Sequence, residues 1–229
     1  MRKLTVIIPI TPEETQWRIL FKDLSVLPKE TNIIFVGPQK PTDFDTMCDK
    51  KQNTKWVQSA IGRGHQMNAG ARSSKSDYLW FLHADSRVSQ KAIDSLQNIL
   101  SDDPEELIYF NLLFQNDGPV LMNLNSLGVW IRSHILGLPF GDQGFCISTK
   151  CFNLVGGFCE KAPYGEDHLF VWKVRHSNLK LRCTGATIST SSRKYRDNGW
   201  GKTTLLHGYL TLKQAMPEML KYITTREEK

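Results

Sequence analysis

The first half of the chain alternates short apolar segments with segments of helical periodicity, and this alternation constrains the fold more than any other feature. The apolar segments are rich in β-branched or aromatic residues and have the length of buried strands: residues 4–10, 32–36, 55–58 and 78–82. Helices are predicted between and after them. Strands that alternate with helices form βαβ crossovers, so we expect an α/β fold with a mostly parallel sheet.

Capping signals predict where the helices of this half begin. Thr11 is a candidate N-cap with Pro12 in the first turn and Glu14 three residues on, and apolar residues at helical spacing follow as far as residue 27. A helix rich in small residues is predicted over residues 65–75, and Ser89 is predicted to cap another.

The second half of the chain is less regular. Strands are predicted at residues 107–114, 144–148 and 179–183, and helices at residues 121–136, 165–176 and 203–222. The last helix is expected to be interrupted near Pro217, and residues 189–202 are expected to form a polar, basic loop. A chain of 229 residues suits one large α/β domain.

Composition and charge limit the cellular compartment and the classes of binding partner that we expect for this protein. The five cysteines form no C-x-x-C pair, and no uncharged apolar run reaches 18 residues, so we expect a cytoplasmic protein without a membrane span. Residues 173–229 carry 12 basic and 4 acidic groups, so this last quarter either faces an anion or forms a solvated basic surface. No nucleic-acid motif accompanies the charge, and we expect no nucleic-acid partner.

Asp85 is the most informative single residue. It follows a buried strand directly, and in parallel sheets ligands bind beyond the carboxyl ends of the strands. A carboxylate there can hold Mg²⁺ or Mn²⁺ against a phosphate, or it can simply cap the loop. From position alone the two interpretations are equally good.

Three other segments have both a chemical and a structural interpretation. The Gly-rich segment around Arg63 suits a phosphate, or a tight turn and close helix packing. Glu166 and Asp167 open a helix, where acids also complement the helix dipole. The basic segment with Arg193 and Trp200 can face a diphosphate and a sugar, or solvent.

In this order, the segments resemble glycosyltransferase family 2, of the GT-A fold. The resemblance rests on the first strand Thr-Val-Ile-Ile-Pro, on Gly-Arg-Gly-His-Gln-Met-Asn-Ala-Gly-Ala followed by Trp-Phe-Leu-His-Ala-Asp, on Gly-Gly-Phe and on Glu166-Asp167. The second of these motifs is similar to the bacterial branch known as radical-SAM/selenodomain-associated glycosyltransferases. The family implies a nucleotide-sugar-binding half (residues 1–115), an acceptor-side half (116–202) and a C-terminal helix and tail (203–229).

The resemblance also implies roles for individual residues. Asp167 would be the catalytic base, with Glu166 as a supporting carboxylate, and Asp85 would bind the metal, with His83 as a second candidate ligand. The implied donor-binding residues are Pro9, Ile10, Arg63, Gln66, Asn68, Ala84, Asp85 and Arg193. The implied acceptor-binding residues are Gln143, Gly144 and Trp200.

Two positions depart from the family pattern. The first position of the family's D-x-D motif is His83 here. The loop after the second strand reads Gly-Pro-Gln-Lys-Pro-Thr-Asp and lacks the usual acidic, Gly-Ser-containing sequence, so Asp43 is the candidate for the acid that binds the base.

The sequence therefore predicts an inverting glycosyltransferase that uses Mn²⁺ or Mg²⁺, a nucleotide-sugar donor and an acceptor hydroxyl. A nucleotidyltransferase and a non-catalytic sugar- or nucleotide-binding relative are the alternatives. The apolar residues of the C-terminal helix, with lysines beside them, suggest peripheral contact with the inner face of a membrane. Packing of that helix on its own domain or in a homodimer is the competing interpretation.

Overall fold

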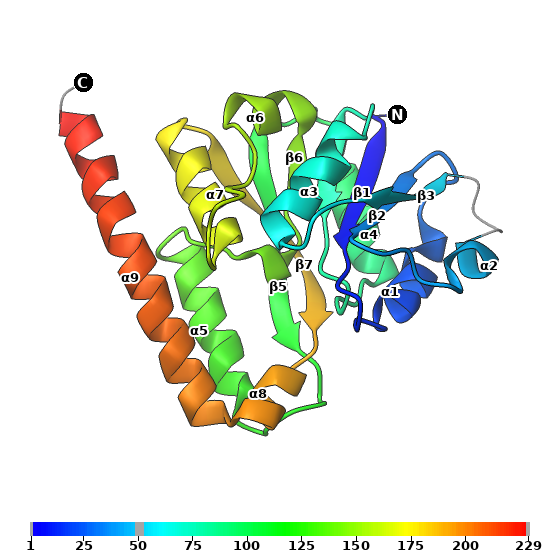
Figure 1. The fold of residues 1–229 in the computed structure, drawn as a ribbon. Helices are drawn as coiled ribbons and strands as arrows, with labels where there is room; N and C mark the ends of the chain where they lie inside the picture. Colours follow the sequence, from blue (N-terminus) through cyan, green and yellow to red (C-terminus); the bar gives the residue numbers. More distant parts are fainter. Residues whose placement is uncertain (1, 49–52, 228–229) are drawn as a thin grey trace.

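The structure, a computed structural model, describes residues 2–48 and 53–227, with side chains as far as residue 224. The expected tail at residues 228–229 lies outside the described residues. One seven-stranded sheet runs through the molecule in the order β3-β2-β1-β4-β6-β5-β7 (Figure 1). Its strands are β1 (Leu4–Pro9), β2 (Asn32–Gly37), β3 (Thr54–Gln58), β4 (Tyr78–Phe81), β5 (Glu106–Phe114), β6 (Cys146–Ser148) and β7 (Lys180–Thr190).

The sheet is mostly parallel, as predicted. Only β6 runs antiparallel to its neighbours, β4 and β5. The parallel pairing of β1 with β2 and β4 brings the carboxyl ends of these strands to one edge of the sheet. That edge receives the loops on which the candidate site is built.

Helices cover both faces of the sheet (Figure 1). The bounds of the longer ones are α1 (Trp17–Asp23), α3 (Arg63–Arg72), α4 (Gln90–Leu100), α5 (Met122–His134), α7 (Glu166–His176) and α9 (Trp200–Glu227). Shorter helices are α2 (Phe44–Cys48), α6 (Thr149–Leu154) and α8 (Arg193–Asn198), with 3₁₀ turns at Leu24–Val26 and Gly141–Gln143.

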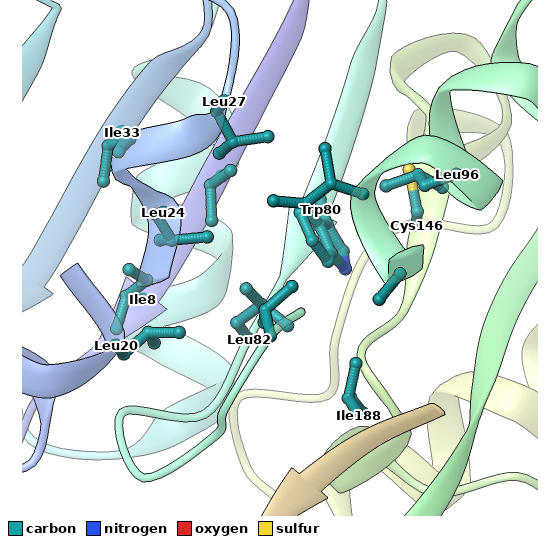
Figure 2. Packing of buried hydrophobic residues seen from close by; sticks show 14 of the residues in the cluster. Ile8, Leu20, Leu24, Leu27, Ile33, Trp80, Leu82, Leu96, Cys146 and Ile188 are labelled. Atoms are coloured by element: carbon teal, nitrogen blue, oxygen red, sulfur yellow. The ribbon is translucent and has the colours of Figure 1, made fainter. Parts of the chain in front are cut away.

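The apolar core has two parts because strand side chains alternate between the two faces. Val6 and Ile8 of β1 pack with α1 and α4 on one face, whereas Ile7 packs with α3, α6 and α7 on the other. Figure 2 shows the first part, in which Trp80 and Cys146 of the sheet lie among leucines from α1, α4 and the turn after α1. Burial on both faces explains why these strands read as continuous apolar runs.

Several predicted elements differ from the structure, among them the helix predicted at residues 65–75, which spans Arg63–Arg72. The first helix begins at Trp17 and not at Pro12, and Thr11 caps nothing there, because the Glu14 carboxylate accepts the Gln16 N–H and holds the segment as a turn. Strand β7 continues to Thr190, because residues 187–190 pair with β5 beyond a register shift. The predicted loop at residues 189–202 therefore contains the end of β7, the helix α8 and the start of α9.

The last helix also differs from the prediction, because it continues through Pro217. Proline removes one backbone donor and disturbs one turn, and here Pro217 is exposed, on the outer side of the helix. Among the described helices, none is long and apolar enough to cross a membrane. Ser89 caps α4 as predicted, since its hydroxyl accepts the Ala92 N–H.

Candidate active site

Asp85 lies in the turn after β4, at the sheet edge that the sequence indicated. Its side chain is partly buried, and its backbone carbonyl accepts a hydrogen bond from Gln115 Nε2 at 3.2 Å. Burial raises the pKa of the Asp85 carboxyl, as does the charge of Glu14, while Arg193 and the Thr190 hydroxyl act in the opposite direction. Removal from water and a like charge both favour a cation at this carboxylate.

A pair of residues from distant parts of the chain accompanies Asp85. Arg193, the first residue of α8, lies with Nη2 at 3.2 Å from Glu14 Oε2, and its Nε donates to Ser191 Oγ at 3.0 Å. Glu14 belongs to the loop after β1. The structure thus brings the predicted Arg193 to Asp85 and adds Glu14, which the sequence suggested only as a capping residue.

The second group of charges forms at the start of α7. Gly165 has a φ of 62°, which allows a sharp entry into the helix, and Glu166 and Asp167 in the first turn are both buried. Asp167 Oδ2 accepts the Gly141 N–H at 2.7 Å, and Oδ1 accepts its neighbour's N–H at 2.8 Å. Burial would raise the pKa of Asp167, but Arg63 and these hydrogen bonds outweigh it and hold the pKa below its usual value, so the carboxylate is ionised at neutral pH.

Arg63 connects the Gly-rich segment to these acids. It is the first residue of α3, and its Nε lies 2.6 Å from Glu166 Oε1. Burial opposes its charge, yet Asp167 and Glu166 together raise the pKa of the guanidinium. The side chain keeps 44% of its surface exposed, so the guanidinium can face a ligand while paired.

His83 faces this second group and not Asp85. Its Nε2 lies 3.5 Å from Arg63 Nη1. A Cβ atom placed on Gly141 would lie 3.1 Å from that nitrogen and 2.9 Å from Asp167 Oδ2, so the three residues converge on one point. Burial, aided by the charge of Arg63, lowers the pKa of His83 to about 3, and the imidazole is neutral.

Asp142 and Arg132 complete the group, and neither was a predicted site residue. Asp142 Oδ1 is buried and has no hydrogen-bond partner within the described residues. Burial raises the pKa of Asp142 to about 6, with further contributions from Asp167 and Asp85 against the opposing charges of Arg132 and Arg63. The Arg132 guanidinium lies 3.2 Å from the centre of the Phe140 ring, and burial lowers its pKa although Asp142 and Asp167 favour its charge.

The sequence offered a partial signal for Asp142 and none for Arg132. Asp142 directly precedes Gln143 and Gly144, the predicted acceptor-binding residues, whereas Arg132 belongs to α5, in which no site residue was predicted. Only the packing of α5 beside the loop brings Arg132 near the carboxylates.

Other predicted donor residues lie near the site but use their side chains within the fold. Gln66 Nε2 donates to the carbonyls of Ile10 and Val36, at 2.8 and 3.1 Å. Asn68 binds Phe158 through both its amide atoms. Pro9, Ile10 and Ala84 are buried at the strand ends, so any contact they make with a ligand must come from the backbone or from a small exposed part.

The three predicted acceptor residues are not brought together. Gln143 is fully buried, and its amide binds Phe110 and Phe140. Gly144 is also buried, and a Cβ atom there would lie 2.9 Å from Ile188 Cδ1. Trp200 starts α9, with its Nε1 donating to Asn125 Oδ1 at 2.6 Å. Gln143 and Gly144 therefore shape the loop that carries Asp142.

A pocket of about 270 Å³ opens beside the ends of β1 and β2. Its lining includes Thr11, Pro12, Lys40 and the ion pair of Arg18 with Asp43. Two hydrogen bonds join this pair, at 2.6 and 2.9 Å, and the Arg18 guanidinium lowers the pKa of the Asp43 carboxyl. Asp43, the predicted replacement for the family's base-binding acid, thus lines a pocket at the expected end of the sheet.

The donor set at Asp85 fits a hard divalent cation shared with a ligand. No group of three or more His, Cys, Asp or Glu side chains able to hold a metal occurs in the part of the chain that the structure describes. Mg²⁺ and similar ions are commonly held by one or two carboxylates plus substrate phosphates. Asp85 supplies such a carboxylate, whereas the cationic Arg63 beside His83 opposes a metal there.

Comparisons with known proteins identify the fold and the family of the chain. No curated protein matches the chain. Among solved structures, S. aureus TarS superposes with a TM-score of 0.63 at 16% identity, covering 82% of this chain and 36% of that one. TarS 1–349 in complex with UDP-GlcNAc superposes with a TM-score of 0.64 at 17% identity, covering 83% of this chain and 58% of that one. The mannosyltransferase PcManGT from Pyrobaculum calidifontis, in complex with GDP-Man and Mn²⁺, superposes with a TM-score of 0.61 at 14% identity. The match covers 82% of this chain and 56% of that one.

These likenesses show the fold, which is the GT-A fold that the resemblance implied. The chain spans less than two thirds of the length of these solved structures. The family model described as "Glycosyl transferase family 2" matches residues 6–159, which is more than half of the chain. The chain therefore belongs to glycosyl transferase family 2.

Proposed function

We propose that this protein is a metal-dependent, inverting glycosyltransferase that moves a sugar from a nucleoside-diphosphate donor to an acceptor hydroxyl. The observation that carries the proposal is the buried, ionised Asp167, held beside Arg63 at the same sheet edge as Asp85. A base next to a cation, with a metal-binding carboxylate nearby, suits displacement of a diphosphate by a hydroxyl. The nucleotide sugars in the TarS and PcManGT structures support this donor class.

On the donor side, Asp85 would hold Mn²⁺ or Mg²⁺ together with the diphosphate. When bound, the ion supplies positive charge that stabilises the leaving phosphate. Arg193 is held by Glu14 and Ser191 close to Asp85, and Arg63 is held by Glu166 at the start of α3. Both guanidinium groups can then bind phosphate oxygens. The pocket at Asp43 is the proposed place for the nucleobase.

On the acceptor side, Asp167 accepts the proton of the acceptor hydroxyl. The hydroxyl oxygen forms a bond to the sugar C1 while the bond from C1 to the diphosphate breaks, which inverts the configuration. Glu166 is a positioning residue, because it holds Arg63. Gly141 and the N–H after Asp167 orient the carboxylate, so the carboxylate keeps one geometry before the acceptor arrives.

Asp142 is a second candidate for the base. Its Oδ1 is free of protein partners among the described residues, whereas both oxygens of Asp167 accept backbone N–H groups. A carboxyl with a pKa of about 6 is also closer to the range that suits a general base at neutral pH. The family resemblance favours Asp167, and Asp142 then binds the acceptor.

Several finer predictions belong to the same proposal. The Gly-Arg-Gly-His-Gln-Met-Asn motif favours the radical-SAM/selenodomain-associated branch of the family. We expect one domain, a cytoplasmic location, a nucleotide-sugar donor, no nucleic-acid partner, and a C-terminal helix in contact with a membrane or with a second subunit. Gln66 would support donor binding by fixing the ends of β1 and β2, and Asn68 by fixing the loop at Phe158.

Product analysis tests the reaction class. The protein is incubated with a panel of nucleotide sugars and Mn²⁺, and the nucleotide products are separated by chromatography. Release of the nucleoside diphosphate supports glycosyl transfer, including slow transfer to water. A parallel incubation with nucleoside triphosphates and sugar 1-phosphates tests the alternative, because release of pyrophosphate from the triphosphate would indicate a nucleotidyltransferase. Absence of any product with every nucleotide sugar that binds would indicate a binding protein.

A further inference from the structure

Helix α9 has its polar and apolar faces in the opposite sense to that of an ordinary surface helix. Its inward side contacts the rest of the protein largely through polar side chains, although Ala215 and Tyr222 also pack against the apolar core. His207 Nδ1 lies 3.2 Å from the Tyr195 hydroxyl, Gln214 Oε1 lies 2.9 Å from His168 Nδ1, and Glu218 Oε2 lies 3.3 Å from His176 Nε2. A helix on the surface of a globular protein normally packs through apolar side chains and exposes polar side chains to water.

The outward side of α9 is apolar. Its exposed large side chains recur at helical spacing along one stripe: Leu205, Tyr209, Leu212, Met216, Met219 and Ile223. Leu212 and Met216 keep 64% and 58% of their surface exposed. A continuous apolar stripe of this length is a mark of contact with something other than water.

Helix α5 presents a second stripe of the same kind. Leu124, Leu127, Trp130, Ile131 and Ile135 are all exposed on α5 and the turn after it. The side chain of Asn125 bonds to both Trp200 and Thr204 in the first turns of α9, so the two helices adjoin where they begin. Figure 1 shows them together along one margin of the molecule, away from β1–β3.

The apolar stripes of α5 and α9 contain no acidic side chain. The sequence has no Asp or Glu from residue 118 to 141, or from residue 198 to 217. Lys202 and Lys213 are exposed on α9, on the same side as the apolar stripe, and Lys194 is exposed in α8 next to them. Lysines within an apolar surface can extend their ammonium groups past it, toward anions lying on top.

We propose that α5 and α9 together dock on the surface of an anionic lipid bilayer. The apolar stripes enter the boundary between headgroups and acyl chains, and Lys202 and Lys213 meet anionic headgroups, as in helices that lie in the plane of a membrane. A second copy of the chain is a poorer fit, because neither stripe offers an acidic side chain to the lysines of the other copy.

This surface extends the proposed function, because it indicates the class of molecule that carries the acceptor hydroxyl. Arg132 belongs to α5 and lies beside the Asp142 and Asp167 carboxylates, so docking of α5 brings the base close to the bilayer. The acceptor hydroxyl would then belong to a lipid-linked molecule at that surface. This part rests on the proposed function, whereas the docking itself does not.

Vesicle sedimentation of the full chain, without nucleotide or acceptor, tests the docking. We expect the protein to pellet with vesicles of mixed phosphatidylcholine and phosphatidylglycerol. The double variant Leu212→Ser/Met216→Ser should weaken this binding by about tenfold or more, because two half-exposed apolar side chains no longer enter the bilayer. The variant Val26→Ser/Leu154→Ser removes two comparably exposed apolar side chains elsewhere and should bind like the wild type.

Charge supplies a second comparison. Lys202→Glu/Lys213→Glu should bind anionic vesicles about 30-fold less tightly or weaker still, since each of the two lysines near the surface contributes about 1 kcal/mol. Equal binding of the wild type to pure phosphatidylcholine vesicles would overturn the assignment to an anionic surface. Failure to bind any vesicle would overturn the docking, and sedimentation equilibrium showing a dimer that Leu212→Ser/Met216→Ser dissociates would assign the face to a second copy. Because no turnover is measured, none of these outcomes depends on the glycosyltransferase reaction.

Discussion

Asp167 and Asp142 lie in one cluster but differ in their surroundings. Asp167 accepts two backbone N–H groups beside Arg63, which holds its pKa low, whereas burial leaves Asp142 with a pKa of about 6 and an unpartnered oxygen. Environments that separate two carboxyl pKa values commonly mark different chemical roles. The two residues therefore give the sharpest test of the mechanism.

Asp167→Asn should lower kcat by about 10²-fold or more, because it removes the general base. Donor affinity should change little, since the amide still accepts the Gly141 N–H. Single-turnover kinetics and nucleotide titration separate the two effects. Asp142→Asn is the matched control. If Asp142→Asn were inactive while Asp167→Asn remained active, Asp142 would be the general base.

The raised pKa of Asp142 also predicts a pH-dependent stability. The folded protein holds this proton more tightly than the unfolded chain does, so the carboxyl destabilises the fold as the pH rises from about 4 through 6. A pKa of about 6 against an ordinary 3.8 corresponds to at most about 3 kcal/mol. Asp142→Asn should therefore melt several degrees above the wild type at pH 8, and this difference should shrink below pH 5. Equal melting temperatures at both pH values would contradict the burial of this charge.

Asp85→Ala tests the metal. Removal of the carboxylate should abolish the part of nucleoside-diphosphate affinity that depends on Mn²⁺, measured by calorimetry with and without the ion. His83→Ala is the comparison, because His83 faces Arg63 and should leave the metal dependence in place. Unchanged Mn²⁺-dependent affinity in Asp85→Ala would count against the metal site.

At the scale of elements, the small residues of α3 allow this helix to pack closely on the sheet. A Cβ atom on Gly70 would lie 2.5 Å from Ile7 Cγ2 and 3.1 Å from Val36 Cγ2, two fully buried strand side chains. The close approach also lets the Gln66 amide reach the carbonyls of Ile10 and Val36. The position of Arg63 at the start of α3 depends on this packing.

Gly70→Ala should lower the free energy of unfolding by about 1–3 kcal/mol, because the helix must move away from the sheet. Gly208→Ala lies in α9, where a Cβ atom meets nothing within 4 Å, and should raise stability by about 0.5–1 kcal/mol through helix propensity. Chemical denaturation of both variants checks the contrast. Stabilisation by Gly70→Ala would show that α3 is less tightly packed than described.

The elements were predictable to different degrees. Strands β1, β2 and β4 differ from the predicted bounds by no more than one residue, because continuous apolar runs arise only where both faces of a strand are covered. The end of β7 and the helix α8 were missed, since their residues are polar and their structure depends on pairing with β5 and on Asp117. The Asp117 carboxylate accepts the Ser192 N–H and hydroxyl, which turns the chain before α8.

At the scale of the whole molecule, donor binding should be visible as stabilisation. A ligand that binds only the folded state raises its stability by about 2.7 kcal/mol at 100 times the dissociation constant. A thermal-shift panel of nucleoside diphosphates and nucleotide sugars, with and without Mn²⁺, should give at least one nucleotide whose shift of several degrees requires the ion. The corresponding nucleoside without phosphates is the control. Equal shifts with and without Mn²⁺ for every nucleotide would contradict a metal shared with the diphosphate.

The sequence by itself determined the α/β architecture, the family and the place of Asp85, Arg63, Glu166 and Asp167 at strand and helix ends. The architecture and these positions follow from local patterns of burial and capping, which each segment carries independently of the rest of the chain, whereas the family follows from the resemblance of the ordered motifs. Only the tertiary structure joined Arg63 to Glu166, turned His83 toward Asp167, and placed Arg132 and Asp142 in the same cluster.

The tertiary structure also decided the orientation of α9. The sequence indicated the apolar residues of this helix, and apolar periodicity normally marks the face that packs inward. Here His207, Gln214 and Glu218 find hydrogen-bonding partners on the protein, so the polar stripe turns inward and the leucines and methionines are left outside. Which stripe packs inward depends on the partners available on α7 and α8, and these come together only when the chain has folded.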